Sequence, residues 1–269
     1  AGAGALAIML LLSLFEPQTI LRLLSLAGLA AGLAVVQLTT RRASSAAMLG
    51  VAAVLVLLLP SSWLELRLSE YKGLEQTLLV DGVSILDSHS SPVSRIDVVE
   101  SAQIPLRYAP GLSLQSDSGV PEQLAVFVDG DAMSAIDRAS GDSGPGYRAF
   151  LSTALPYELG RHHDEVLVLN AGTGADVLQA LLLGATSVDA VELDPAMIAL
   201  VEQRYAAFAG DLYGDPRVNL HVGEARGFAR RSDQRFDLVQ IGLLDAFAVS
   251  GSGVQALNEN YLYTVEAIG

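Results

Sequence analysis

The sequence predicts an α/β protein in three consecutive parts: N-terminal transmembrane helices, a small antiparallel β-region, and a doubly wound, Rossmann-like parallel sheet. Three observations predict this fold. The first 64 residues are apolar and nearly uncharged, and strand and helix patterns alternate from Tyr147 onward. The segment VLVLNAGTGADV, residues 166–177, joins an apolar β-branched run to a glycine turn and a helix, as an open parallel sheet does where it binds a nucleotide.

Charge divides the chain into an uncharged front and an acidic remainder. The 269 residues carry a net charge of −14, with 17% charged residues and a mean hydropathy of +0.41. Residues 1–64 contain one acid, Glu16, and three bases, Arg22, Arg41 and Arg42, so the acidic charge lies after residue 64. This balance argues against nucleic-acid binding, which needs basic surface. The lack of cysteine is compatible with either side of a membrane.

The front predicts membrane-spanning helices. Residues 20–38 and 46–62 form apolar stretches close to the roughly 20 residues that cross a bilayer, and residues 3–15 look like part of another. A signal peptide would be single, whereas these segments repeat across short loops. We therefore expect an integral membrane protein with the lipid bilayer as a partner. Because the first span is incomplete and no Met precedes it, we expect the natural protein to begin earlier.

The basic loop at Arg41 and Arg42 bears on orientation. Positive loops tend to stay in the cytoplasm, so this loop favours an extracytoplasmic position for the acidic part that follows the third span. Arg22, Arg67 and Lys72 weaken that count.

Residues 65–146 are expected to form the small β-rich region and a linker. Short β-rich runs occur at Gln76–Val80, Arg95–Glu100 and Leu124–Val128, and the stretch Ala139–Gly146 has the Ser, Gly, Asp and Pro content of a linker.

Residues 147–269 are expected to form the parallel sheet. The predicted strands are Glu165–Leu169, Ser187–Leu193, Val218–Val222 and Phe236–Ile241. The predicted helices are Ala175–Leu183, Pro195–Phe208 and Ala225–Arg230. Asp194 is the expected N-cap of the second helix, with Pro195 at its first position, and Gly184 is the expected stop of the first. The chain ends soon after the fourth strand, so we expect it to continue beyond Gly269, or another chain to cover the bare edge in a homo-oligomer or membrane complex.

The glycine turn and an acid after the second strand predict an adenosine site. Glu192 follows Gly172 by 20 residues, the spacing of an acid that binds ribose hydroxyls. Val177 stands where the dinucleotide fingerprint has its third glycine, so a pyrophosphate ligand fits poorly. A tight strand-to-helix turn without a ligand is the alternative.

These motifs carry a family resemblance over about Ser69 to Ile268. VLVLNAGTGADV, VDAVELDP, DPRVNLHVGEARGF and FDLVQIGLLDAF, in this order, resemble the core of the spermidine synthase (polyamine aminopropyltransferase) superfamily, and most closely its subgroup with transmembrane helices. That superfamily has the fold of class I S-adenosylmethionine-dependent methyltransferases. The resemblance implies S-adenosylmethionine, decarboxylated S-adenosylmethionine or methylthioadenosine as ligand. It implies cofactor contacts from Asn170, Ala171, Gly172, Thr173, Gly174, Glu192, Leu193, Glu224 and Ala225. For Glu224 the alternative is an acid that stabilises a helix N-terminus.

The chain departs from the family pattern where polyamines are handled. The aspartate of the family's glycine loop is replaced by Thr173, with Asp176 nearby, and the first acid after the fourth strand is replaced by Gly242, which leaves Asp245. In the family's Tyr-His-Glu element Tyr147 is kept, but Arg and Ala follow it. The candidate catalytic residues are therefore Asp245, Tyr147 and Asp176.

Two hypotheses follow. The first is a membrane-anchored aminopropyl or methyl transferase acting on a small amine with an eroded polyamine site. The second is a catalytically inactive pseudoenzyme that serves as a scaffold or accessory subunit of a membrane complex. The four histidines show no spacing that suggests a metal site, and we expect none.

Overall fold

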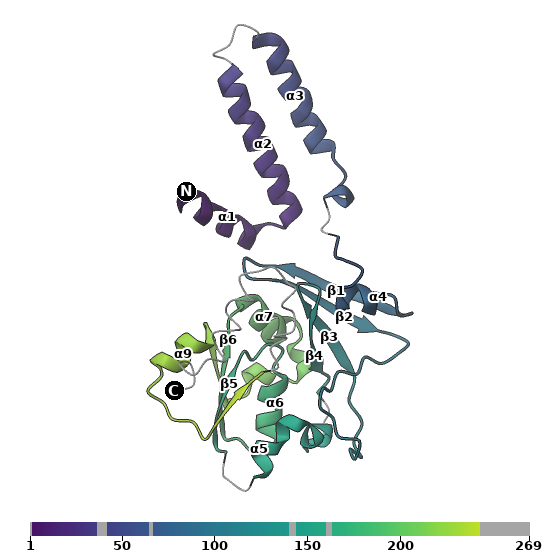
Figure 1. Cartoon of the computed structure of the whole chain (residues 1–269), viewed down its shortest axis with the longest axis vertical. Coiled ribbons are helices and arrows are strands. Elements are labelled where there is room, and N and C mark those ends of the chain that lie inside the picture. Colours follow the sequence, from purple (N-terminus) through teal and green to yellow (C-terminus); the bar gives the residue numbers. More distant parts are fainter. Residues whose placement is uncertain (1, 37–41, 65–66, 140–143, 160–162, 243–269) are drawn as a thin grey trace. The chain divides into compact units, whose positions relative to one another are not determined.

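A computed structural model describes residues 2–36, 42–64, 67–139, 144–159 and 163–242 (Figure 1). The chain divides into two compact units. One consists of residues 1–69 with 90–93, and the other of residues 70–89 with 94–269. Each unit is described by itself.

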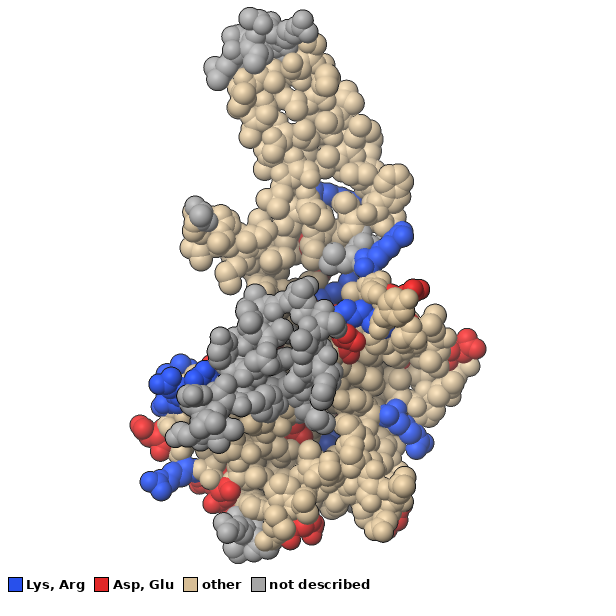
Figure 2. All heavy atoms as spheres, in the orientation of Figure 1, with Lys and Arg blue, Asp and Glu red and all other residues tan. Residues whose placement is uncertain are grey.

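The first unit is helical. Its helices are α1 (Gly2–Leu14), α2 (Pro17–Val36) and α3 (Arg42–Leu58), followed by the short 3₁₀ helix η1 (Ser61–Trp63). Arg22, near the start of α2, donates hydrogen bonds to the carbonyl of Leu59 (2.8 Å) and to Ser61 Oγ (3.1 Å), so α2 and α3 run antiparallel, side by side (Figure 1). The described part of this hairpin beyond Arg22 shows neither basic nor acidic atoms on the face seen in Figure 2.

One of the three expected spans has full membrane length in the described part of the chain. Helix α2 is 20 residues long and apolar enough to cross a bilayer, whereas α1 and the apolar stretch Ser44–Leu58 of α3 are shorter. Apolar side chains on these helices, such as Leu6, Met48 and Leu58, are largely exposed. A single such helix is weak support for a membrane anchor.

The second unit begins with an antiparallel sheet, as expected for the β-rich region within residues 65–146. Its strands are β1 (Val83–Ser90), β2 (Arg95–Ser101), β3 (Gln123–Val128) and β4 (Ala132–Asp137), in that order. Val98 lies opposite Val126, and Ala125 opposite Ala135. The central strands β2 and β3 are buried on both faces.

The β-rich interpretation of Gln76–Val80 is wrong. This stretch overlaps helix α4 (Gly73–Leu78), whose Leu74 is fully buried. The helix starts against Phe127 of β3, and the Thr77 hydroxyl bonds back to the Gly73 carbonyl (2.8 Å). Burial of Leu74 therefore outweighs the β propensity of the run.

A four-stranded parallel sheet follows. Its strands are β5 (Glu165–Leu169), β6 (Ser187–Glu192), β7 (Val218–Val222) and β8 (Leu238–Ile241), in the order β7-β6-β5-β8. All three neighbouring pairs are parallel. The chain therefore steps one way from β5 to β7 and then crosses to the other side of β5. The predicted doubly wound α/β fold is confirmed.

The helices of this unit lie between the strands. They are η2 (Gly146–Phe150), η3 (Ser152–Ala154), α5 (Leu155–Glu158), α6 (Ala175–Leu182), α7 (Pro195–Ala199), α8 (Ala206–Ala209), η5 (Leu212–Gly214) and α9 (Ala225–Arg231). Asp194 caps α7 as predicted, its side chain accepting from the Ala196 amide. The expectation of one helix over Pro195–Phe208 is wrong, because the π-helical turn Leu200–Arg204 separates α7 from α8. There the Tyr205 amide bonds to the Leu200 carbonyl, five residues back.

The core explains how the two sheets hold together. One large apolar cluster joins Val98 and Val126 of the antiparallel sheet to Val168 of β5 through side chains of α6 and α7, including Val177 and Met197. A smaller cluster on the opposite face of the parallel sheet, including Leu167, Val191 and Ala225, lies under α9. Helices therefore cover both faces of the parallel sheet.

Candidate functional site

The candidate site lies at the carboxyl ends of the parallel strands. The turn Asn170–Gly174 follows β5, Glu192 ends β6, and Gly242 follows β8. The strand order reverses between β5 and β8, and open α/β sheets bind ligands in the crevice at such a switch point. The fold thus brings together residues separated by 72 positions in the chain.

The glycine turn has a backbone that few residues accept. Asn170, Gly172 and Gly174 have φ values of +58°, +52° and +84°. The two glycines differ in their surroundings. A Cβ on Gly172 would meet only the Asn170 carbonyl oxygen, at 3.9 Å, whereas a Cβ on Gly174 would lie 2.5 Å from Leu212 Cδ2. Among the described residues, Gly172 therefore has room for a neighbouring ligand, as a ligand-facing turn needs, and Gly174 allows close packing beneath it.

The other two residues of the turn face the protein. Ala171 and Thr173 are both buried, and the Ala171 amide donates to the Val191 carbonyl (2.9 Å). The hydroxyl of the buried Tyr213 donates to the Gly172 carbonyl (2.8 Å), which fixes the turn from below.

Glu192 holds the turn in place. Its Oε2 accepts from the Gly172 amide (2.8 Å) and its Oε1 from the Asp194 amide (2.9 Å). Burial raises the pKa of this carboxyl, and the two amide bonds oppose that rise. Each carboxylate oxygen can accept a second hydrogen bond, so these contacts leave acceptor capacity for a ribose diol. Leu193, the next residue, is half-buried.

Glu224 and Ala225 lie at the carboxyl end of β7. The Glu224 carboxylate accepts from the amides of Arg226 (2.8 Å) and Gly227 (2.6 Å), which makes it the N-cap of α9. Ala225 is buried in the smaller cluster. The Glu224 side chain therefore caps the N-terminus of α9, as the alternative interpretation of this residue predicted.

Asp176 lies at the switch point. Its Oδ1 accepts from Gln240 Nε2 of β8 (2.8 Å). Its Oδ2 lies 3.2 Å from where a Cβ on Gly242 would stand, and the Asn170 carbonyl oxygen lies 2.9 Å from the same point. Burial raises the pKa of Asp176, opposed first by the charge of Arg148 and then by the Gln240 hydrogen bond.

Tyr147 takes part in a buried polar cluster with β4. Its hydroxyl donates to Asp137 Oδ2 (2.8 Å), and Arg148 pairs with the same oxygen (2.7 Å). Burial raises the pKa of Tyr147 strongly. Arg148 also donates to the Ala175 carbonyl (2.8 Å), which ties this cluster to the first turn of α6 beside Asp176.

Sequence reasoning missed several of these polar residues. Arg148 stood out in the sequence only as the replacement of the family's histidine, and Gln240 belongs to no motif. Gln240 nonetheless links Asp176 with the Tyr157 hydroxyl (2.8 Å). The buried glutamine itself was the available signal, since buried polar groups need partners.

Two expectations concern residues outside the described ranges. Asp245 and His162 both lie there. Within the described ranges, no group of three or more His, Asp or Glu side chains could hold a metal ion. His221 instead pairs with Asp189 (2.6 Å), and His163 with the Pro156 carbonyl (2.6 Å).

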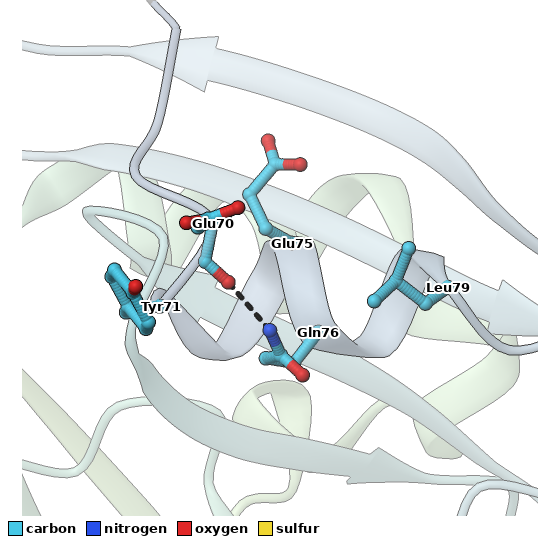
Figure 3. A pocket seen from close by; sticks show the side chains of 5 residues that line it. All are labelled: Glu70, Tyr71, Glu75, Gln76 and Leu79. Carbon is cyan, nitrogen blue, oxygen red and sulfur yellow. Dashed lines mark hydrogen bonds between the residues drawn. The ribbon is translucent and has the colours of Figure 1, made fainter.

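A pocket of about 390 Å³ lies elsewhere in the second unit, beside α4. Figure 3 shows its lining by Glu70, Tyr71, Glu75, Gln76 and Leu79, with Gln76 donating to the Glu70 carbonyl (2.5 Å). Because α4 packs on Phe127, and side chains alternate along β3, this helix covers the sheet face opposite the large cluster. The pocket is therefore separate from the crevice.

Comparisons with known proteins find similarity in the part of the chain that contains this site. Residues 151–260 match the family described as Spermine/spermidine synthase domain. Similar curated proteins are three polyamine aminopropyltransferases. That of Thermoplasma volcanium is 29% identical over 96 residues, 35% of each chain. That of Korarchaeum cryptofilum is 27% identical over 84 residues, 31% of this chain. That of Sulfolobus acidocaldarius is 25% identical over 99 residues, 36% of this chain. The matched segments are 26%, 35% and 33% of the relatives, so the match spans about a quarter to a third of their length.

Two solved structures are similar to this chain in fold. A spermidine synthase in complex with the transition-state analogue AdoDATO superposes with a TM-score of 0.48 at 19% identity, over 68% of this chain and 52% of that one. The spermidine synthase from Thermotoga maritima superposes with a TM-score of 0.43 at 19% identity, over 60% and 48%. The family match covers the parallel sheet with its glycine turn, so residues 151–260 are similar to the Spermine/spermidine synthase domain.

Proposed function

We propose that the chain is a membrane-anchored transferase that moves an aminopropyl group from decarboxylated S-adenosylmethionine to a small amine. The observation that carries the proposal is Asp176, a carboxylate at the switch point beside the glycine turn. Methyl transfer from S-adenosylmethionine is the same chemistry with a smaller group, and the assay below distinguishes the two.

Asp176 supports the proposal because it can do the work of the acid absent at position 242. An amine must lose a proton to become a nucleophile, and a positioned base contributes about 10²–10⁴-fold to such a step. Oδ2 of Asp176 faces Gly242, where the resemblance places the family's acid. A side chain at 242 would begin 2.9 Å from the Asn170 carbonyl oxygen, so Asp176 and an acid at 242 compete for one space.

The surroundings of Asp176 suit a general base. Burial raises its pKa above the ordinary value, which makes the carboxylate a stronger base. Gln240 holds Oδ1, so Oδ2 is the oxygen oriented toward the crevice. We propose that Oδ2 accepts the proton of the incoming amine.

The donor would be held by the turn and by Glu192. Its sulfonium supplies an electrophilic carbon and a neutral thioether as leaving group. The Gly172 backbone borders the adenosine, and the Glu192 carboxylate accepts from the ribose hydroxyls through its remaining lone pairs. Glu192 being nearly buried, a ribose that reaches it displaces little water.

The acceptor is proposed to differ from the usual polyamines. The Asp137 carboxylate is already bonded by Arg148, Tyr147 and Gln123, so it is not available to hold an ammonium group. We therefore propose a small amine as acceptor, with Tyr147 stabilising the cluster and Asp245 as a second acid whose contribution is open to test.

A radiolabel-transfer assay tests the proposal. The full chain in detergent is incubated with labelled decarboxylated S-adenosylmethionine, or with labelled S-adenosylmethionine, and a panel of mono- and diamines. We expect transfer to at least one amine, reduced about 10²–10⁴-fold by Asp176→Asn. Asp81→Asn, at an exposed loop residue, is the matched control. Asp245→Asn is assayed in parallel.

The second candidate is an inactive scaffold or accessory subunit of a membrane complex. It is favoured by the engagement of both Glu192 oxygens with backbone amides, which gives this acid a structural purpose without a ligand. The end position of β8, with Val239 half-exposed in the described part of the sheet, would then bind another chain. Absence of transfer from either donor to every amine, together with a stable complex in native membranes, would favour this candidate.

Membrane anchoring is part of the proposal. Support comes from α2, from the exposed apolar side chains of α1 and α3, and from Arg22, whose hydrogen bonds place its charge at the hairpin end. The basic pair Arg41 and Arg42 favours an extracytoplasmic domain. A topology reporter fused after Arg67 tests the side of the membrane: a cytoplasmic signal would contradict the extracytoplasmic position, while the membrane anchor and the transferase proposal would stand.

A further inference from the structure

A buried hydrogen bond joins the antiparallel sheet to the candidate site. Ser94, directly before β2, donates from its hydroxyl to Asp194 Oδ2 at 2.6 Å. Ser94 is 7% exposed and Asp194 5%, and they are 100 residues apart in the chain. A short bond to a buried carboxylate is among the stronger neutral-to-charged hydrogen bonds.

Asp194 connects Ser94 with Glu192 through hydrogen bonds. Its Oδ1 accepts from the Ala196 amide (2.9 Å), which caps α7, and its own amide donates to Glu192 Oε1 (2.9 Å). Glu192 Oε2 in turn accepts from the Gly172 amide (2.8 Å). The chain of contacts therefore runs from Ser94 through Asp194 and Glu192 to the glycine turn.

We infer that Ser94 is a positioning residue for the adenosine site, acting through Asp194 to set the orientation of Glu192. Ser94 directly precedes β2 of the antiparallel sheet, whereas Glu192 ends β6 of the parallel sheet. Its hydroxyl fixes the Asp194 side chain at one oxygen while α7 fixes the other, so the Asp194 amide points at Glu192. The inference rests on the proposed function in one respect, that Glu192 binds a ribose.

Calorimetry with methylthioadenosine on the full chain in detergent tests the inference. Couplings of this kind change affinity by about 2- to 30-fold, and we expect Ser94→Ala to weaken binding within that range. Ser94→Thr keeps the hydroxyl and should restore wild-type affinity. The matched control is Ser88→Ala, which removes an equally short serine-to-aspartate bond in the same sheet, to Asp97 Oδ1 (2.6 Å); the other described side-chain partner of Asp97 is Arg95.

A second measurement needs no variant. Coupling is reciprocal, so methylthioadenosine bound at Glu192 should slow amide hydrogen exchange at Arg95, beside Ser94, more than at Glu100, at the other end of β2. Equal protection at both amides would overturn the inference, as would Ser94→Ala binding like wild type. Failure of the wild-type chain to bind methylthioadenosine would overturn the proposed function instead, together with this role of Ser94.

Discussion

The two glycines of the turn should differ sharply when replaced by alanine. Both have positive φ, so each substitution incurs the left-handed penalty of about 1–2 kcal/mol. At Gly174 the new Cβ would also lie 2.5 Å from Leu212 Cδ2, and Leu212 is itself buried. Forcing an extra carbon into a packed core costs about 1–3 kcal/mol more. The expected losses are thus about 2–5 kcal/mol for Gly174→Ala and about 1–2 kcal/mol for Gly172→Ala.

Denaturant unfolding of the full chain in detergent, followed by circular dichroism, measures this difference. Ligand binding should rank the variants differently. Gly172 faces open space, so its replacement should weaken methylthioadenosine binding although it costs less stability. Equal stability losses for the two variants, or the larger loss at Gly172, would refute the description of this turn.

Three further predictions follow from the polar contacts. Burial raises the folded-state pKa of Asp176 above the ordinary 3.8. The contribution of Asp176 to stability is therefore present below pH 3.8 and is lost as the pH rises through the folded-state pKa. Thermal melts across roughly pH 4–8 should show this decline in the wild-type chain and a flatter one in Asp176→Asn. Arg148→Met should cost about 3–5 kcal/mol in denaturant unfolding because it leaves the buried Asp137 carboxylate without its cation, and adding Asp137→Asn should recover part of that loss. Glu224→Ala should cost about 1 kcal/mol in the same assay as a lost helix cap, and unchanged methylthioadenosine affinity would exclude a role at the adenine.

The parallel sheet was predictable because its signals are local. The bounds of β5 and β7 agree with the predicted strands. β5 is a buried apolar run, whereas β7, at the end of the sheet, alternates apolar and polar residues. The break at Leu200–Arg204 was not predictable, because a π-turn keeps the apolar pattern of the helices around it. Strand β1 was missed since it is largely exposed and carries serine, aspartate and histidine.

The candidate site was predictable only in part. The glycine turn and Glu192 lie within 23 residues and belong to one strand–helix–strand unit, so spacing alone pointed to them. The bond between Gln240 and Asp176 spans 64 residues, and that between Ser94 and Asp194 spans 100. The first pair depends on the return of β8 to the side of β5, and the second on how the two sheets pack; no local pattern encodes either.

The central claim is that the site at the carboxyl ends of the parallel strands binds an adenosyl ligand through Glu192 of β6. Isothermal titration of methylthioadenosine into the full chain and into Glu192→Ala tests it most directly, with circular dichroism to establish that the variant is folded. The account predicts saturable one-to-one binding to the wild-type chain and loss of that binding in Glu192→Ala. Absence of binding to the wild-type chain, or equal binding by a folded Glu192→Ala chain, would contradict it.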